Sequence, residues 1–144
     1  MATPGLLVVT HGRLAEELVT AIRTIVGDLD ALEAVSIDWD DDVTESRTRI
    51  EKALRAVDRG SGVLILTDMF GGTPTNLALS FLEPGHVEVI TGVNLPMLIK
   101  YTNLRDDADF TETARKIAEQ GREAIQVASE LLHGSAGSSG GQGS

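Results

Sequence analysis

The chain has 144 residues, of which 42% are hydrophobic and 24% are charged, and its formal net charge is -10. This composition is typical of one globular domain with a buried core, and the negative charge disfavours binding to nucleic acid or to an anionic membrane surface. A local phosphate site is still compatible with it, because helix N-termini and backbone amides bind anions without Lys or Arg. The sequence has no cysteine, which excludes disulfides and thiolate zinc sites.

The N-terminal residues lack the basic segment and long apolar stretch of a secretory signal, and no run approaches the ~18 apolar residues of a membrane-spanning helix. We therefore expect a cytoplasmic protein. A single domain is expected over residues 1–133. Residues 134–144 are almost entirely Gly and Ser, which predicts a flexible tail.

Short aliphatic runs alternate with amphipathic segments along the chain. The run Leu6–Val9 predicts a strand, and the apolar spacing after it predicts a helix that ends near Gly27. A second strand is expected over Leu32–Ile37, followed by a helix that ends near Gly60. The two helical stripes consist of Leu14, Leu18, Ala21, Ile22 and Ile25, and of Val43, Ile50, Leu54 and Val57.

The second half of the chain continues the alternation. Val63–Leu66 is apolar on both faces, as a buried parallel strand is, and the glycine turn after it opens a third helix. A fourth strand is expected over Val87–Ile90, and a short helix is expected after Pro96. One long last helix is expected over residues 110–132.

Four alternations of strand and helix with short connections predict an α/β fold with a mostly parallel sheet and helices on both faces. We expect a three-layer flavodoxin-like arrangement with strand order 2-1-3-4. In such sheets ligands bind beyond the carboxyl ends of the strands, where the strand order reverses. The residues to examine are therefore Thr10-His11-Gly12 after the first strand and Thr67–Pro74 after the third.

His11 and Asp68 follow neighbouring strands in this order and are expected to lie side by side. A carboxylate that accepts a hydrogen bond from one imidazole nitrogen fixes the tautomer and leaves the other nitrogen free to attack. On phosphorus the covalent product is a phosphohistidine. His11 and Asp68 are therefore the predicted catalytic pair, with no metal and no cofactor required.

A phosphoryl group on histidine needs its negative charge stabilised. The Gly71-Gly72 turn allows backbone amides to approach closely, and Thr73 offers a hydroxyl at the predicted N-cap. Pro74 just inside the helix agrees with that boundary. We expect Gly71, Gly72, Thr73 and Thr10 to line the phosphoryl site.

His11, Asp68 and the Gly71-Gly72 turn each have a simpler structural interpretation when taken alone. The prediction of a phosphoryl site depends on their convergence at one edge of the sheet. The acidic residues 38–42 are interpreted as a solvated turn, with metal binding as the alternative, and no role is assigned to His86 or His133. A flavin- or nucleotide-binding protein is the alternative at the level of the fold. It is weakened because the chain has no P-loop, no G-x-G-x-x-G and few aromatic residues.

The chain contains four motifs in order: Leu7–Gly12 with Leu14-Ala15-Glu16, then Asp68–Asn76, then Gly92–Met97, and finally Gly121-Arg122-Glu123. Together they resemble the mannose-family enzyme IIA subunits of the bacterial phosphoenolpyruvate-dependent sugar phosphotransferase system. The resemblance covers residues 5 to 132 in the right order, which makes it specific.

The resemblance implies a homodimer with a flavodoxin-like core, in which one antiparallel edge strand is exchanged between subunits. It implies that His11 receives a phosphoryl group from HPr and passes it to a IIB protein or domain, with a membrane reached only through a permease complex. Asp68 matches the carboxylate that orients the histidine, and Thr73 matches a hydroxyl that contacts the phosphoryl group.

The chain departs from the best-known members in two ways. It has Phe70 and Thr73 where they have Trp and Ser, and no IIB domain follows its last helix. Its output is therefore either sugar uptake or a regulatory phosphorelay. A regulatory binding module that is switched by phosphorylation, and a relative of the dihydroxyacetone kinase phosphocarrier subunit, are the alternatives.

Overall fold

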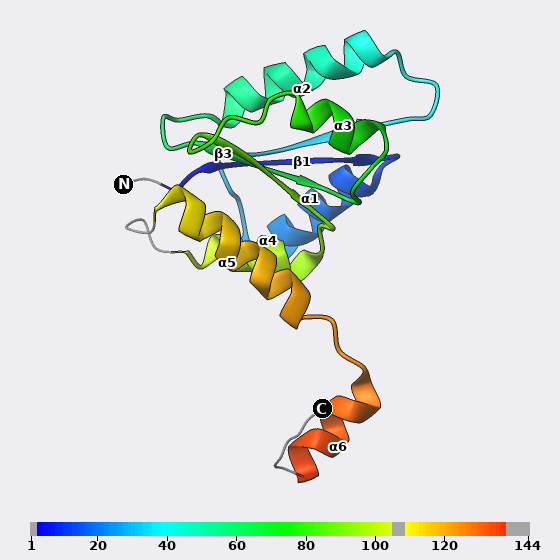
Figure 1. The fold of residues 1–144 in the computed structure, drawn as a ribbon, viewed down its shortest axis with the longest axis vertical. Helices are drawn as coiled ribbons and strands as arrows, with labels where there is room; N and C mark the ends of the chain where they lie inside the picture. Colours follow the sequence, from blue (N-terminus) through cyan, green and yellow to red (C-terminus); the bar gives the residue numbers. More distant parts are fainter. Residues whose placement is uncertain (1–2, 105–108, 138–144) are drawn as a thin grey trace.

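The structure is a computed structural model that describes residues 3–104 and 109–137. Helices cover both faces of a single four-stranded sheet (Figure 1). The strands are β1 (Gly5–His11), β2 (Leu32–Ile37), β3 (Val63–Thr67) and β4 (Val87–Thr91). The helices are α1 (Leu14–Val26), α2 (Val43–Val57), α3 (Thr73–Leu79), α4 (Leu95–Thr102), α5 (Phe110–Glu123) and α6 (Ala128–Gly137).

The sheet has the order β2-β1-β3-β4, and each neighbouring pair of strands is parallel. The predicted α/β fold and its strand order are therefore confirmed. The predicted stop of the first helix is also confirmed, because α1 ends at Val26 and its C-cap is Gly27, with φ of 92°. That backbone conformation disfavours residues with a Cβ atom.

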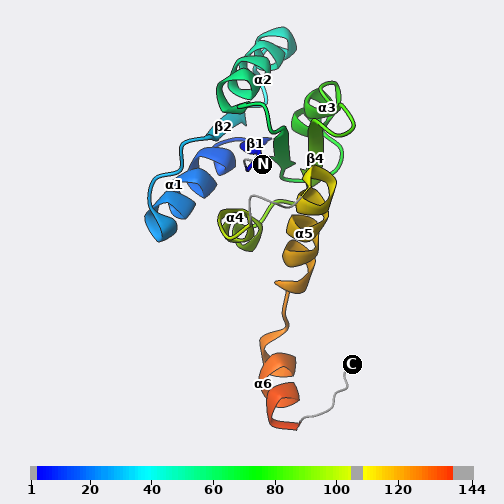
Figure 2. The same ribbon diagram turned by 90° about the vertical axis from the view of Figure 1, so that its left-hand side faces the viewer.

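Strand β1 shows why both faces of the sheet are covered. Successive side chains of a strand point to opposite faces, and all four residues from Leu6 to Val9 are buried. Leu6 and Val8 pack with α1, α4 and α5, whereas Leu7 and Val9 pack with α2 and α3. Figures 1 and 2 show these two helical layers on either side of the sheet.

The predicted single helix over residues 110–132 is wrong, because the structure has two helices there. Helix α5 ends at Glu123, and α6 begins at Ala128 and lies away from the sheet (Figures 1 and 2). The apolar stripe continues in sequence through Ile125 and Leu132, but both side chains are exposed. Gly121 is the last buried residue of α5, and the apolar residues that continue the stripe after it are exposed in the described part of the chain.

Helix α6 continues through Gly137, so its last residues overlap the first residues of the expected tail at 134–144. Residues 138–144 lie outside the described residues. In the described ranges β4 is an edge strand, and they contain no antiparallel strand to pair with it, apart from an isolated bridge between Glu83 and Val87.

Candidate active site

The carboxyl ends of β1 and β3 bring His11 and Asp68 into contact. Val9 of β1 lies beside Thr67 of β3, so the residues that follow emerge next to each other. His11 Nδ1 lies 2.9 Å from Asp68 Oδ2, and the same oxygen accepts a hydrogen bond from the His11 backbone N–H at 3.0 Å. One carboxylate oxygen therefore fixes both the backbone and the ring of the histidine.

This contact determines which ring nitrogen is available for chemistry. An ionised carboxylate only accepts hydrogen bonds, so Nδ1 carries the proton and the lone pair is on Nε2. The His11 side chain is 28% exposed and that of Asp68 is 14% exposed. The imidazole is therefore accessible to a reaction partner, while the carboxylate that orients it is largely covered.

Gly72 lies against the available edge of the imidazole. A Cβ atom at this position would come within 3.0 Å of both His11 Cε1 and Nε2, and Gly72 has φ of +86°. Gly71 has a similar φ of +90°, but a Cβ atom there would meet nothing within 4 Å. Glycine at position 72 is thus required both by the backbone conformation and by the close approach to the ring.

The loop between β3 and α3 is held by Thr75, which the sequence analysis did not single out. Thr75 is fully buried, and its Oγ1 donates to the Met69 carbonyl and lies 2.8 Å from Thr67 Oγ1. These contacts tie the first turn of α3 back to the end of β3. Asp68 lies within that closed loop, so Thr75 supports the position of the carboxylate.

Two of the expected phosphoryl-site residues, Thr10 and Thr73, have different surroundings in the structure. Thr10 is fully buried, and its Oγ1 accepts a hydrogen bond from the Ala15 N–H at 2.6 Å, so it ties the end of β1 to α1. Thr73 is the first residue of α3, because the N-cap is Gly72, and its side chain is exposed. The predicted N-cap at Thr73 is therefore wrong by one residue, whereas Pro74 lies in the first turn as expected.

Trp39 also borders the histidine, a contact that was not predicted from the sequence. The centroid of its ring lies 5.6 Å from that of His11, with an angle of 38° between the planes. Aromatic pairs interact favourably at centroid distances of ~4.5–7 Å. Trp39 comes two residues after β2, at the same carboxyl edge as His11. This position in the sequence could have indicated that it lies near the site.

The acidic residues 38–42 build the turn before α2. Asp42 accepts a hydrogen bond from the Glu45 N–H at 3.0 Å, and Asp41 accepts one from the Asp38 N–H at 2.9 Å. Residues 3–104 and 109–137 contain no group of three or more His, Cys, Asp or Glu side chains that could hold a metal ion.

A second histidine–aspartate pair lies at the opposite edge of the sheet. His86 Nε2 is 2.9 Å from Asp58 Oδ2. The backbone N–H of Gly60 donates to Asp58, and this bond, with that to His86, lowers the pKa of Asp58. The pair joins the segments that precede β3 and β4, far from the carboxyl edge, so we interpret it as structural.

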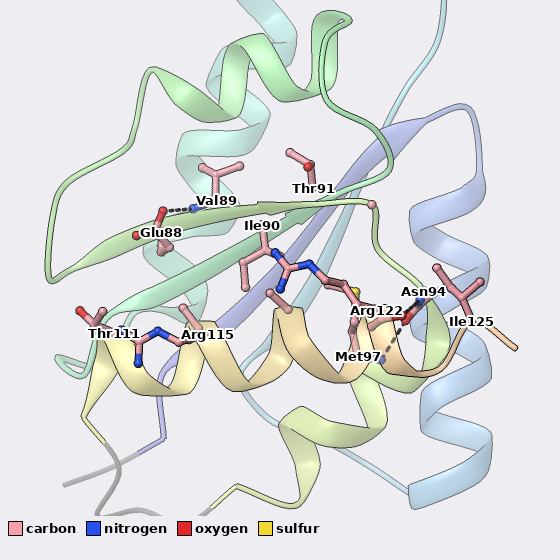
Figure 3. A pocket seen from close by; sticks show the side chains of 14 residues that line it. Glu88, Val89, Ile90, Thr91, Asn94, Met97, Thr111, Arg115, Arg122 and Ile125 are labelled. Atoms are coloured by element: carbon pink, nitrogen blue, oxygen red, sulfur yellow. Dashed lines mark hydrogen bonds between the residues drawn. The ribbon is translucent and has the colours of Figure 1, made fainter. Parts of the chain in front are cut away.

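A surface hollow lies between β4 and α5 (Figure 3). Glu88–Thr91 line one side of it, and Arg115, Arg122 and Ile125 line the other. Neither His11 nor Asp68 borders it. The hollow follows the open edge of the sheet, and it is a separate feature from the histidine site.

The protein is an α/β protein with a parallel sheet, and an aspartate-bound histidine lies at the carboxyl edge of that sheet. This histidine is a candidate nucleophile. Residues 5–118 match the family model of EIIA-man, described as "PTS system fructose IIA component". The chain therefore belongs to the mannose-type EIIA family of the phosphotransferase system, as a phosphocarrier component. The resemblance given by its sequence motifs is confirmed.

Individual relatives agree with this assignment. The chain is 36% identical over 132 residues to the mannose-specific EIIAB component of Escherichia coli, covering 87% of this chain but only 39% of that protein. It is 30% identical over 123 residues to the fructose-specific EIIA component of Bacillus subtilis, covering 85% and 84% of the two chains. The chain thus spans about two fifths of the first relative and most of the second.

Solved structures give the same result for the fold. The mannose/sorbose-specific IIA subunit from Enterococcus faecalis matches with a TM-score of 0.77 at 29% identity, covering 88% of this chain and 95% of that one. A PTS IIA protein associated with the fucose utilization operon of Streptococcus pneumoniae matches with a TM-score of 0.79 at 25% identity, covering 92% and 99%. In the described part of the chain, no helix is long and apolar enough to cross a membrane.

Proposed function

We propose that this protein accepts a phosphoryl group on His11 from phospho-HPr and passes it to a IIB protein or domain, in the cytoplasm. The observation that carries the proposal is the 2.9 Å contact between His11 Nδ1 and Asp68 Oδ2, which leaves Nε2 as the nucleophile. A bond forms between Nε2 and phosphorus while the donor's bond to phosphorus breaks. The Nδ1 proton stays on the ring, where Asp68 stabilises the positive charge that develops.

Positioning carries most of the catalysis in this proposal, as in phosphoryl transfer generally. Gly72 brings the backbone to the Nε2 edge of the ring, so the incoming phosphoryl group meets main chain rather than a side chain. Thr73 is exposed beside it and is the proposed hydroxyl contact. Thr10 accepts a hydrogen bond from the Ala15 N–H and so holds the end of β1, which carries His11, against α1.

Sugar uptake is the proposed output. The relatives named above are described as specific for mannose and for fructose, which supports a sugar substrate for the downstream permease. A IIB protein or domain is the proposed acceptor, because the Escherichia coli relative is described as an EIIAB component.

A homodimer is proposed as the functional assembly. β4 has an open outer edge in the described part of the chain, and an open edge offers unpaired backbone groups to a further strand. Ile125 beside this edge is 77% exposed, and Val127 is exposed as well. If a second copy of the chain placed its segment around Ile125 and Val127 in the hollow between β4 and α5, it would cover both the open edge of β4 and these exposed apolar residues.

The proposal is tested by phosphoryl transfer from phosphoenolpyruvate through enzyme I and HPr, read by intact mass. We expect one acid-labile phosphoryl adduct on the wild type and none on His11→Ala. A wild type that stays unlabelled with cognate HPr that is itself phosphorylated would overturn the proposal, as would an adduct that persists in His11→Ala.

A further inference from the structure

Three large apolar side chains are exposed on the two loops that border His11. Trp39 is 93% exposed, Phe70 75% and Met69 55%. Met69 and Phe70 directly follow Asp68, and the Trp39 ring lies 5.6 Å from the His11 ring. A protein that binds over the imidazole from the side of these loops covers this apolar surface.

The loop that carries Trp39 is held in place although its tip is exposed. The Asp38 N–H donates to Asp41 Oδ2 at 2.9 Å, and Arg49 Nη1 lies 3.5 Å from the same oxygen. Arg49 Nη2 also donates to the Ser36 carbonyl at 2.8 Å. An exposed tryptophan on a held loop loses little conformational entropy when a partner covers it.

The charge around Trp39 is mainly negative. Asp38, Asp40 and Asp42 are exposed on the same loop. Arg13, which follows His11-Gly12, lies 3.7 Å from Glu16 and 3.6 Å from Glu17, so its charge is offset on its own helix. The surface near the histidine therefore combines an apolar centre with an acidic border, which complements a basic partner with an apolar centre.

We propose that Trp39 is a specificity-determining residue, the anchor that the phosphoryl donor protein covers with a basic, apolar-centred face when it docks over His11. This inference rests on the proposed function and adds to it the residue that selects the donor. A buried aromatic anchor surrounded by a polar rim is the usual source of binding energy at protein interfaces. Because Trp39 is 93% exposed in the free protein, it contributes little to the core and is available for that contact.

The test is the single-turnover rate of phosphoryl transfer over a series of phospho-HPr concentrations, for the wild type, Trp39→Ala and Trp39→Phe. Trp39→Ala is expected to raise the half-saturating donor concentration by about tenfold or more, with the maximum rate within about twofold of the wild type. Trp39→Phe is expected to restore most of the affinity. Leu82→Ala, which truncates another exposed apolar residue, is the matched control and is expected to change neither parameter.

A binding measurement accompanies the kinetics. Trp39 is the chain's one tryptophan, so its fluorescence reports on this site alone. Adding unphosphorylated HPr is expected to shift the emission to the blue as the indole is covered. Trp39→Ala is expected to unfold within about 2 °C of the wild type, because exposed residues contribute little to stability.

Three results would overturn the proposal. The first is an unchanged half-saturating concentration in Trp39→Ala. The second is a reduced maximum rate at unchanged half-saturation, which would make Trp39 a positioning residue for the His11 ring. The third is HPr binding, detected by another method, without a shift in emission. A wild type that takes up no phosphoryl group would instead overturn the proposed function, and the fluorescence titration would still decide on docking.

Discussion

Asp68 contacts His11 twice through one oxygen, Oδ2, while its Oδ1 is buried without a hydrogen-bond partner in the described part of the chain. The orientation of the imidazole thus depends on a single acceptor atom. The charge on that atom also matters, because the ring becomes more positive as Nε2 takes up phosphorus.

Asp68→Asn keeps the shape of the carboxylate but removes its charge. We expect phosphoryl transfer to slow by about tenfold or more, because a hydrogen bond to a charged group is worth ~1.5–3 kcal/mol and ~1.4 kcal/mol is a factor of ten in rate. Single-turnover labelling measures this rate. Asp58→Asn, which alters the other histidine–aspartate pair, is the matched control and should leave the rate unchanged. An equal loss in both variants would contradict a specific role for Asp68.

Gly71→Ala and Gly72→Ala form a second matched pair. Both residues have positive φ, at +90° and +86°, a conformation that residues with a Cβ atom rarely adopt, so each substitution strains the backbone. Only the Cβ atom at position 72 would lie 3.0 Å from His11 Nε2. We expect similar unfolding midpoints for the two variants but much slower labelling for Gly72→Ala. Equal labelling rates would show that the backbone at position 72 does not border the reacting nitrogen.

The elements are joined by a small number of buried polar contacts, and one of them fixes the N-terminal strand. The Tyr101 hydroxyl on α4 donates to the Pro4 carbonyl just before β1, at 2.6 Å. Burial raises the pKa of Tyr101 from 10.0 to about 12. The folded protein therefore favours the neutral phenol more strongly than the unfolded chain does.

This raised pKa predicts a loss of stability at alkaline pH. The contribution of Tyr101 is fully present below pH 10.0 and is lost as the pH rises to about 12. Because Tyr101 is the one tyrosine of the sequence, tyrosinate absorbance titrates it directly. Tyr101→Phe should lower the free energy of unfolding at pH 7 by about 1 kcal/mol and flatten its decline above pH 10.0. An absorbance midpoint near 10.0 in the folded protein would contradict this account.

The sequence was sufficient to predict the elements up to α4. Both faces of the sheet are buried, so the strands appear in the sequence as short, continuous apolar runs. The pattern failed at the last helix. Ile125 and Leu132 continue the stripe of α5, but a stripe does not reveal where the surface that it packs against ends. The packing surface of α5 ends with β4 and with Met97, which lies against Gly121. Both depend on tertiary structure and cannot be seen in the apolar pattern of the sequence.

At the scale of the whole molecule, the described part of the chain exposes the apolar loops around His11 and the hollow along β4. The sequence predicted that His11 and Asp68 meet, because strand order alone brings them together. It did not predict Trp39 beside them, because that contact depends on the conformation of the turn at residues 38–42. The bonds of Thr75 were missed for the same reason, since they depend on how the loop after β3 closes.

The proposed dimer predicts the behaviour of the second surface. We expect the wild type to sediment as a dimer at micromolar concentration and Ile125→Asp to shift it toward monomer, because a charge would enter an apolar contact at the β4 edge. Leu82→Asp, at another exposed apolar position, should remain dimeric. A monomeric wild type would contradict the dimer and leave the chemistry of His11 unaffected.

The central claim is that phosphorus is carried on Nε2 of His11, and phosphorus–nitrogen coupling in the NMR spectrum of isotope-labelled phosphoprotein tests it most directly. Nδ1 is bound to Asp68, so we predict coupling to Nε2 of His11 and none to a nitrogen of His86, whose own aspartate lies at the same distance of 2.9 Å. Coupling to Nδ1 of His11, or to either nitrogen of His86 or His133, would contradict the account.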